Sequence, residues 1–326
     1  MIVPRHWAEA RLQHREPRRQ VTIKRFGWSD ESQEAAQAMA NERAAEAMKL
    51  VLAGQKLKRF EPKVAYNGAE GVPIREEIVG IHGDTIITRN AYGARCLNTP
   101  NVLFADVDFK KSETGCGYLI AFFAWSIASF IADAWIHPAW LRFATIPAAP
   151  IVGGLVLGRV WLWRQRHNTV NEKQKALERI EQFSNDNPTW SFRLYRTPNG
   201  YRILVTHRPF SPTDSEVLSF FAAIGTDSIY QRMCQNQQCF RARVSPKPWR
   251  IGIKEHVKPI SGAWPIAPEK VPLRNAWVER YEAAAKDYAA CEYISSYGYA
   301  TVHSTVRSVL ALHDSLSGAE SGKPIA

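Results

Sequence analysis

Two aspartates that follow a short apolar run are the residues whose spacing most directly suggests chemistry. The run 102–109 contains Asp106 and Asp108, separated by one residue. A strand turns successive side chains to opposite faces, so the two carboxylates share one face. They can hold Mg²⁺ or Mn²⁺ between them, because these hard cations prefer oxygen ligands. The alternative is an ordinary strand end, whose aspartates cap a turn or pair with arginines.

The composition indicates a globular protein with a phosphate-bearing partner. The chain has 326 residues, enough for one large or two ordinary domains. Its net charge of +11 comes from 42 Lys+Arg against 31 Asp+Glu, and it favours a nucleotide, a nucleic acid or a membrane surface as partner. Five scattered cysteines indicate neither a disulfide framework nor a zinc site, and they favour a reducing compartment. The Arg-rich start lacks the apolar segment of a secretory signal.

Two apolar segments predict a transmembrane helical hairpin directly after the aspartates. Residues 117–135 and 143–163 are each close to the ~20 residues that a bilayer-spanning helix needs. Tryptophans lie mostly near the segment ends, and Gly154 and Gly158 offer a close-packing face. Basic residues flank the hairpin, so the positive-inside rule predicts a bacterial inner membrane location with both termini cytoplasmic. The alternative is a buried hairpin in a large core, or a re-entrant segment.

The segments on either side predict an α+β core with the ferredoxin-like order β-α-β-β-α-β, into which the hairpin is inserted after the first strand. An Asn-Gly turn at 199–200 joins the two middle strands. In this arrangement both helices cover one face of the sheet and leave the other face open. The expected strands are 102–109, 191–196, 201–207 and 239–244, and the expected helices are 171–183 and 213–224.

The alternation within these strands places charge from every strand on the open face. One parity is apolar throughout and belongs beneath the helices. The other parity carries two aspartates beside four arginines, and this surplus of positive charge predicts a metal-bound, phosphate-bearing substrate. The alternative is an Arg–Asp network without a ligand. The charged set is Asp106, Asp108, Arg193, Arg202, Arg241 and Arg243.

The strand with the two aspartates, the helix after it and the turn Thr197-Pro-Asn-Gly200 resemble the palm of archaeo-eukaryotic primase and primase-polymerase proteins. The whole chain also looks like uncharacterised bacterial membrane-hairpin proteins that carry such a module. The resemblance covers about 102–244 without the hairpin, and the family's motif histidine falls on Arg202 here. It implies two-metal nucleotidyl transfer, with Asp106 and Asp108 on Mg²⁺ or Mn²⁺ and arginines on the triphosphate.

The candidate site residues follow from these patterns and from the resemblance. The predicted catalytic residues are Asp106, Asp108 and Arg202, and the two aspartates are also the predicted metal ligands. The predicted phosphate-binding residues are Arg193, Arg196, Arg241, Arg243, Lys247, Arg250 and His207.

The expected organisation has five parts. They are a basic arm with a peripheral helix (1–60), the N-terminal part of the core (61–110), the transmembrane hairpin (111–167), the remainder of the core (168–250) and a C-terminal helical region (251–326). The hairpin would contact the lipid bilayer through residues 117–163, and its glycines are also compatible with a homo-oligomer.

Three function classes follow. The first is a membrane-anchored enzyme with a primase-like palm and metal-dependent nucleotide binding or nucleotidyl transfer. The second is a non-catalytic membrane protein that binds nucleic acid, nucleotide or anionic lipid through a basic sheet face. The third is an Asp-x-Asp glycosyltransferase, which fits less well because residues 20–100 show no nucleotide-binding βαβ units.

Overall fold

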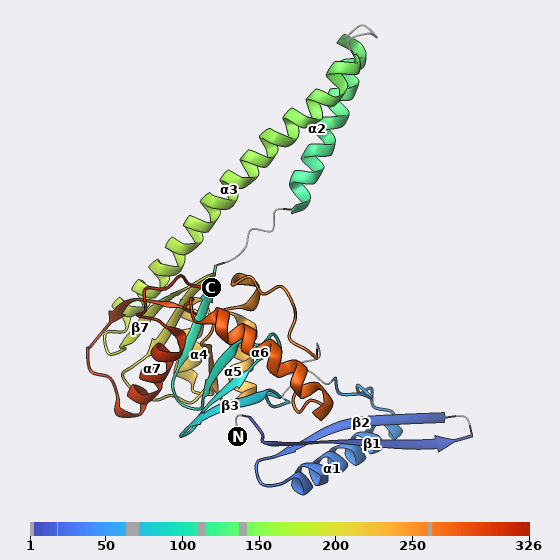
Figure 1. Cartoon of the computed structure of the whole chain (residues 1–326), viewed down its shortest axis with the longest axis vertical. Coiled ribbons are helices and arrows are strands. Elements are labelled where there is room, and N and C mark those ends of the chain that lie inside the picture. The colour runs from blue at the N-terminus through green and yellow to red at the C-terminus, as the bar shows by residue number, and fades with distance from the viewer. Residues whose placement is uncertain (1–2, 18, 63–71, 110–114, 137–141, 260–262) are drawn as a thin grey trace. The chain divides into compact units, whose positions relative to one another are not determined.

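The computed structural model describes the chain apart from residues 1–2, 18, 63–71, 110–114, 137–141 and 260–262 (Figure 1). The chain divides into two compact units, one made of Met1–Val107 with Phe183–Ala326 and the other of Asp108–Gln182. The strands among the described residues belong to three sheets, one of two strands and two of four strands.

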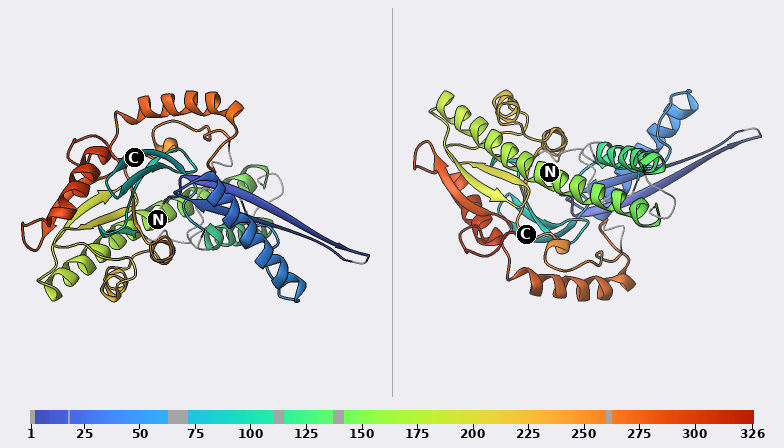
Figure 2. Two further views of the ribbon diagram at one scale, coloured as in Figure 1. Left: turned by 90° about the horizontal axis from the view of Figure 1, so that it is seen from below. Right: turned by 90° about the horizontal axis from the view of Figure 1, so that it is seen from above.

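The first element is a long β-hairpin backed by a helix. Strands β1 (His6–Glu16) and β2 (Arg19–Ser29) pair antiparallel along their whole length, and α1 (Gln33–Leu52) follows. The N-cap of α1 is Ser32, whose hydroxyl accepts the Ala35 N–H at 3.1 Å. Figure 2 shows α1 lying along the hairpin. The sequence predicted a basic arm before the peripheral helix, and the structure has a strand pair there.

Small residues allow the helix to approach the hairpin closely. A buried cluster joins Ala8 and Ala10 of β1 to Ala36, Ala40 and Ala44 of α1. A Cβ on Gly27 of β2 would lie 2.2 Å from the carbonyl oxygen of Ala36, so only glycine fits at that position. The side of the hairpin that carries these residues is therefore closed by α1.

The second sheet has the order β3-β4-β5-β9 and is antiparallel throughout. Helix α6 (Val271–Ala285) packs against it. Its Trp277 ring lies so close to Gly93, between β4 and β5, that a Cβ on this glycine would be 2.2 Å from the ring. Its Glu282 also pairs with Arg89 of β4 at 2.9 Å. Two short 3-10 turns, η2 (Pro248–Arg250) and η3 (Pro268–Lys270), precede α6. The strands are β3 (Glu77–His82), β4 (Thr85–Arg89), β5 (Arg95–Thr99) and β9 (Phe240–Arg243).

The third sheet has the order β10-β7-β8-β6. One face is apolar and buried through residues such as Ala105, Leu194 and Ile203. Helix α7 (Ser304–Ser317) covers the other face, where the His313 ring lies 5.2 Å from that of Phe104. The strands are β6 (Phe104–Asp108), β7 (Phe192–Thr197), β8 (Gly200–Val205) and β10 (Glu292–Tyr297), and helices α4 (Ser215–Ile224) and α5 (Ser228–Gln237) lie between β8 and β9 in the chain.

The ferredoxin-like sheet predicted from the sequence is wrong. Its fourth strand, β9, pairs with β5 in the second sheet and not with β6. The Tyr230 hydroxyl lies between β6 and β9, 3.1 Å from the Phe104 carbonyl and 3.0 Å from the Arg241 carbonyl. It occupies the place where backbone hydrogen bonds would join β6 to β9 if these strands were paired. The face expected to be open is covered by α7, and its Arg193 and Arg202 pair there with Asp314 and Asp106.

The second unit is made of α2 (Gly115–Ile136) and the part of α3 (Arg142–Asp186) up to residue 182. The two helices approach closely at Gly153, where a Cβ would lie 2.3 Å from the Trp125 ring. At Gly158, the second residue of the predicted packing motif, a Cβ would meet no described atom within 4 Å.

The predicted transmembrane hairpin is also wrong. Within the residues that the structure describes, no helix combines the length and the apolarity needed to cross a membrane. The second apolar segment and the charged segment 171–183, predicted as separate helices, belong to the single 45-residue helix α3. The inner membrane location and the bilayer contact through residues 117–163 were both inferred from this hairpin. Without a membrane-spanning helix among the described residues, the predicted location is not supported.

Candidate functional site

Asp106, the first predicted metal ligand, is held by an arginine. Arg202 of β8 donates from Nε to Oδ1 of Asp106 at 2.8 Å and from Nη2 to Oδ2 at 3.0 Å. Arg202 is 2% exposed, and its Nη1 donates to the Arg243 carbonyl at 2.7 Å. Burial alone would lower the pKa of Arg202, but the ion pair with Asp106 outweighs it and raises that pKa. Both oxygens of the carboxylate are therefore engaged by a permanent cation.

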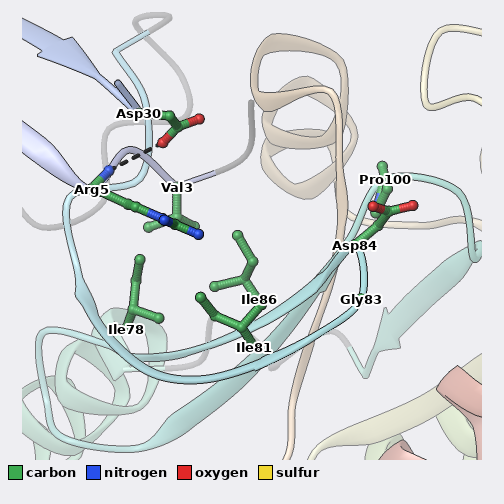
Figure 3. Close-up of a pocket in the computed structure, with 9 residues that line it drawn as sticks. All are labelled: Val3, Arg5, Asp30, Ile78, Ile81, Gly83, Asp84, Ile86 and Pro100. Carbon is green, nitrogen blue, oxygen red and sulfur yellow. Dashed lines mark hydrogen bonds between the residues drawn. The ribbon is translucent and has the colours of Figure 1, made fainter. Parts of the chain in front are cut away.

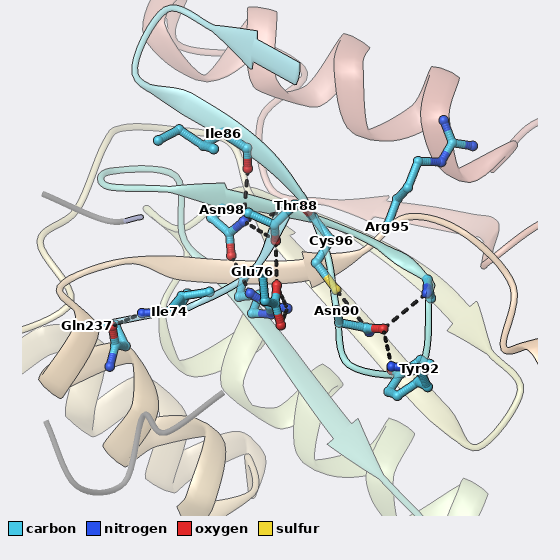
Figure 4. Close-up of polar contacts among 12 residues, drawn as sticks. Ile74, Glu76, Ile86, Thr88, Asn90, Tyr92, Arg95, Cys96, Asn98 and Gln237 are labelled. Carbon is cyan, nitrogen blue, oxygen red and sulfur yellow. Dashed lines mark hydrogen bonds and ion pairs between the residues drawn. The ribbon is translucent and has the colours of Figure 1, made fainter. Parts of the chain in front are cut away.

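A second buried network contains Glu76, Thr88 and Asn98 (Figure 4), and Arg241 of β9 belongs to it. Its Nη2 donates to both carboxylate oxygens of Glu76, at 2.9 and 2.7 Å, and its Nη1 donates to Asn98 at 2.8 Å. The Thr88 hydroxyl donates to Glu76 at 2.7 Å, and Asn98 donates to Thr88 at 3.1 Å. Glu76 is 1% exposed, so this network is sealed inside the second sheet.

The other predicted phosphate-binding arginines of the strands also have partners in the protein. Arg193 pairs with Asp314 of α7 at 2.9 Å and with Glu320. Arg196 pairs with Glu292 on the neighbouring strand. The guanidinium of Arg243 donates to the carbonyls of Ser245 and Ala326. The surplus of arginine over aspartate is thus matched by glutamates and by backbone carbonyls.

The remaining predicted residues are not brought to one place. Asp108 is exposed at the end of β6 and begins the second unit. Lys247 lies 5.5 Å over the Trp249 ring, and Arg250 ends the turn η2. His207 accepts the Ser191 N–H at 3.1 Å, and burial lowers the pKa of this histidine.

The described residues do not assemble a metal centre. No cluster of three or more His, Cys, Asp or Glu side chains among them is placed to hold a cation. A divalent ion at Asp106 would also have to share this carboxylate with the Arg202 guanidinium, whose positive charge repels the ion. The charged face of the third sheet fits the alternative of an Arg–carboxylate network that stabilises the fold.

A cysteine, a histidine and an aspartate lie in a row, in the order of a nucleophile, its base and an orienting carboxylate. The Cys291 Sγ is 3.9 Å from Nε2 of His313, whose Nδ1 is 2.9 Å from Asp314. Burial alone would raise the pKa of Cys291, but its hydrogen bond with His313 outweighs this and lowers it. Cys291 and His313 are both 0% exposed, so no substrate reaches the sulfur and the group is structural.

A cavity of about 490 Å³ lies between the base of the first hairpin and the turn of β3 and β4 (Figure 3). Aliphatic side chains point into it, among them Ile78, Ile81 and Ile86. Its Asp30 already accepts the Arg5 backbone N–H at 3.2 Å. Arg5 and Asp84 are its other charged lining residues and the rest of the lining is mainly aliphatic, so we do not take this cavity as the candidate site.

The outer face of the first hairpin differs from all these places, because its polar side chains point to solvent. Strand register puts Arg11 opposite Lys24, Gln13 opposite Thr22, and Arg15 opposite Gln20, all on the face turned away from α1. Arg11, Gln13, Arg15 and Gln20 are exposed, and Thr22 and Lys24 are half-buried. Lys24 pairs with Glu9 at 2.8 Å, whereas Arg11 and Arg15 make no hydrogen bond or ion pair with any described residue.

A basic segment lies at the edge of this face. The Lys24 N–H donates to the Arg59 carbonyl at 2.9 Å, and Phe60 forms a parallel bridge with Lys24. This backbone pairing places the exposed residues Lys58 and Arg59 beside β2, and the exposed Lys56 precedes them in the chain. Neither the hairpin face nor this segment was predicted from the sequence, although Val21 and Ile23 alternate with polar residues as in a half-buried strand.

Comparison with known proteins adds no relative: no family model, curated protein or solved structure matches the chain. The resemblance to the primase palm therefore stays a prediction.

Proposed function

We propose that this protein binds nucleic acid through the outer face of the β1–β2 hairpin, without metal-dependent chemistry. The observation that carries the proposal is the contrast in arginine pairing. Arg202 and Arg241 each hold a carboxylate inside a sheet, whereas Arg11 and Arg15 stand exposed and unpaired among the described residues. Exposed cations without a partner are the groups that phosphates neutralise when counterions are released.

The side chains between the cations favour a nucleic acid over an anionic lipid surface. Gln13, Gln20 and Thr22 both donate and accept hydrogen bonds, as contacts to sugars and base edges require. A face that inserts into a lipid surface carries large apolar side chains beside its cations. The exposed Leu12 lies on the opposite parity of β1, on the side of α1.

Metal-dependent nucleotidyl transfer has less support from the geometry. It requires Asp106 to coordinate a cation, and this carboxylate is held by Arg202 through both oxygens. Glycosyl transfer through the same Asp-x-Asp pair has the same requirement. Binding without chemistry needs only the hairpin face.

The test is a titration of fluorescently labelled, mixed-sequence oligonucleotides, read by anisotropy at several salt concentrations with Mg²⁺ or with chelator. The variant Arg11→Gln/Arg15→Gln removes two charges from the face, and Arg232→Gln/Arg307→Gln removes two charges from α5 and α7 as the matched control. The salt slope should fall by about 0.9 for each phosphate that the hairpin variant no longer neutralises, and it should stay unchanged in the control. Equal binding by both variants, or binding that requires Mg²⁺, would overturn the proposal.

A further inference from the structure

We infer that the nucleic acid is B-form duplex DNA and that the β1–β2 hairpin enters its major groove. This inference rests on the proposed function and names its ligand. Three features support it: the shape of the hairpin, the chemistry and spacing of its outer side chains, and the position of its aromatic residues.

The hairpin has a shape that the major groove admits. This groove is about 12 Å wide and takes a two-stranded β-ribbon. β1 and β2 form such a ribbon over eleven paired positions, and α1 closes one side of it. Only the outer face is left to meet the floor of the groove.

The side chains of this face are of the types that read bases in the major groove. Arginine donates two hydrogen bonds to O6 and N7 of guanine, and glutamine makes two hydrogen bonds with N6 and N7 of adenine. Arg11, Gln13 and Arg15 follow one another on the outer face of β1, and Gln20 and Thr22 face them from β2. The only carboxylate in these described rows is Glu9, which pairs with Lys24.

The spacing of these rows suits a short stretch of duplex. Residues two apart on one face of a strand are separated by about 6.8 Å, which is about two base pairs at 3.4 Å each. The three positions from Arg11 to Arg15 therefore span about four base pairs. The matching row from Gln20 to Lys24 runs beside it, so the two strands can read the same short site.

The basic segment 56–59 gives the ribbon a place to hold phosphate. Its backbone is hydrogen-bonded to β2 at Lys24, so Lys58 and Arg59 flank the edge of the ribbon, and Lys56 lies two residues before them in the chain. A ribbon in the groove brings the phosphates of the groove wall beside such an edge. Phosphate contacts of this kind fix the register of a protein on the duplex, and the base contacts then select the sequence.

The aromatic residues of the hairpin argue against a single-stranded ligand. Single-strand binding uses exposed rings on which bases stack. Trp7 and Phe26 of this face lie under the guanidinium of Arg75, at 4.6 and 4.4 Å, and Trp28 lies under that of Arg43 at 4.7 Å. Their faces are therefore occupied. Duplex RNA is disfavoured because its major groove is too deep and narrow for side chains to read.

The experiment compares the full chain on a DNA duplex, an RNA duplex and a DNA single strand, and then selects preferred sites from a DNA duplex with a randomised centre. We expect the DNA duplex to bind at least about tenfold more tightly than the other two, and an enriched site of about four base pairs to emerge. Replacing its guanines by 7-deazaguanine, which removes N7, should weaken the selected site without weakening random duplex.

The variant Gln13→Ala/Gln20→Ala keeps every charge of the face and removes two base-reading side chains. It should lose about 10- to 100-fold of the preference for the selected site over random duplex. Gln174→Ala, at an exposed glutamine of α3, is the matched control and should change nothing. Similar affinity for all three ligands, or an unchanged preference in the variant, would overturn the inference and leave the proposed function standing. No binding to any nucleic acid would overturn both.

Discussion

The arginines of the strands in the two four-stranded sheets and those of the β1–β2 hairpin belong to the same residue type but have different roles. Arg202 and Arg241 are largely buried, and each gives two hydrogen bonds to one carboxylate. Arg11 and Arg15 lie on an exposed sheet face and have no partner among the described residues. The net charge of +11 therefore does not by itself locate a ligand site, because the first group is neutralised inside the protein.

The difference has an energetic side. A buried charge whose partner is removed remains without water, which strongly destabilises the fold. Removal of an exposed charge costs the fold little, but a ligand that depends on that charge no longer binds. Substitutions of the buried pairs in the sheets should therefore lower stability strongly and binding little. Substitutions on the hairpin face should lower binding strongly and stability little.

The largest effect on stability is expected at the buried pair of the second sheet. Glu76→Gln leaves the Arg241 cation without a counter-charge and should lower the free energy of unfolding by about 3–5 kcal/mol. Chemical denaturation measures this, with Glu255→Gln as control, since the pair of Glu255 with Arg280 is exposed. The control should leave the free energy of unfolding almost unchanged, because solvent screens an exposed pair. A small change in Glu76→Gln would mean that Arg241 is not held as described.

A smaller structural effect is expected inside the hairpin module. Gly27→Ala places a methyl group against the backbone of α1, so the helix has to shift, at about 1–3 kcal/mol. The same substitution should also weaken nucleic-acid binding, because α1 supports the ribbon. Gly54→Ala serves as a contrast, since a Cβ there meets no atom within 4 Å and only its φ of +91° opposes it. Unchanged stability in Gly27→Ala would contradict the close packing of α1 on β2.

The substitutions on the hairpin face should leave the stability of the fold unchanged, unlike those in the sheets. Arg11→Gln/Arg15→Gln breaks no hydrogen bond or ion pair among the described residues, so its free energy of unfolding should stay within about 0.5 kcal/mol of the wild type. Thermal and chemical unfolding measure this beside the binding titration. A marked decrease in stability would show that these arginines support the fold as those of the sheets do.

The smallest effect concerns pH and a histidine beside the third sheet. Burial lowers the pKa of His207, so the unfolded chain takes up its proton at a higher pH than the folded chain does. This residue therefore contributes stability at neutral pH that is lost as the pH falls below about 6.5. Unfolding at pH 7.5 and pH 5.5 should show a smaller acid destabilisation in His207→Gln than in the wild type. An equal or larger destabilisation in the variant would contradict the lowered pKa.

Local patterns in the sequence predicted part of the core. The Asn-Gly turn placed β7 and β8, and their alternation placed Leu194 and Ile203 on a buried face. The alternation also put Asp106 and Arg202 on one face, where they do meet. It did not show that α7, which lies in the predicted helical region 251–326, covers that face. Helix α7 follows β8 by about a hundred residues, and local patterns carry no information on such contacts.

The partners of the other arginines were beyond reach for the same reason. Glu76 and Arg241 are 165 positions apart, and Arg193 and Asp314 are 121 apart. Counting charge within the strands left four arginines against two aspartates, and the missing carboxylates came from segments outside the predicted strands. The hairpin was missed because Pro17 and the many arginines outweighed the alternation around Val21.

The most direct test of the central claim compares Arg11→Gln/Arg15→Gln with Asp106→Asn in one titration of labelled duplex DNA, with Mg²⁺ and with chelator, once circular dichroism has shown both variants to be folded. We expect the hairpin variant to bind much more weakly, whereas Asp106→Asn should bind as the wild type does whether or not Mg²⁺ is present. Binding that survives in the hairpin variant but requires Mg²⁺ and disappears in Asp106→Asn would contradict the claim and return the site to the third sheet.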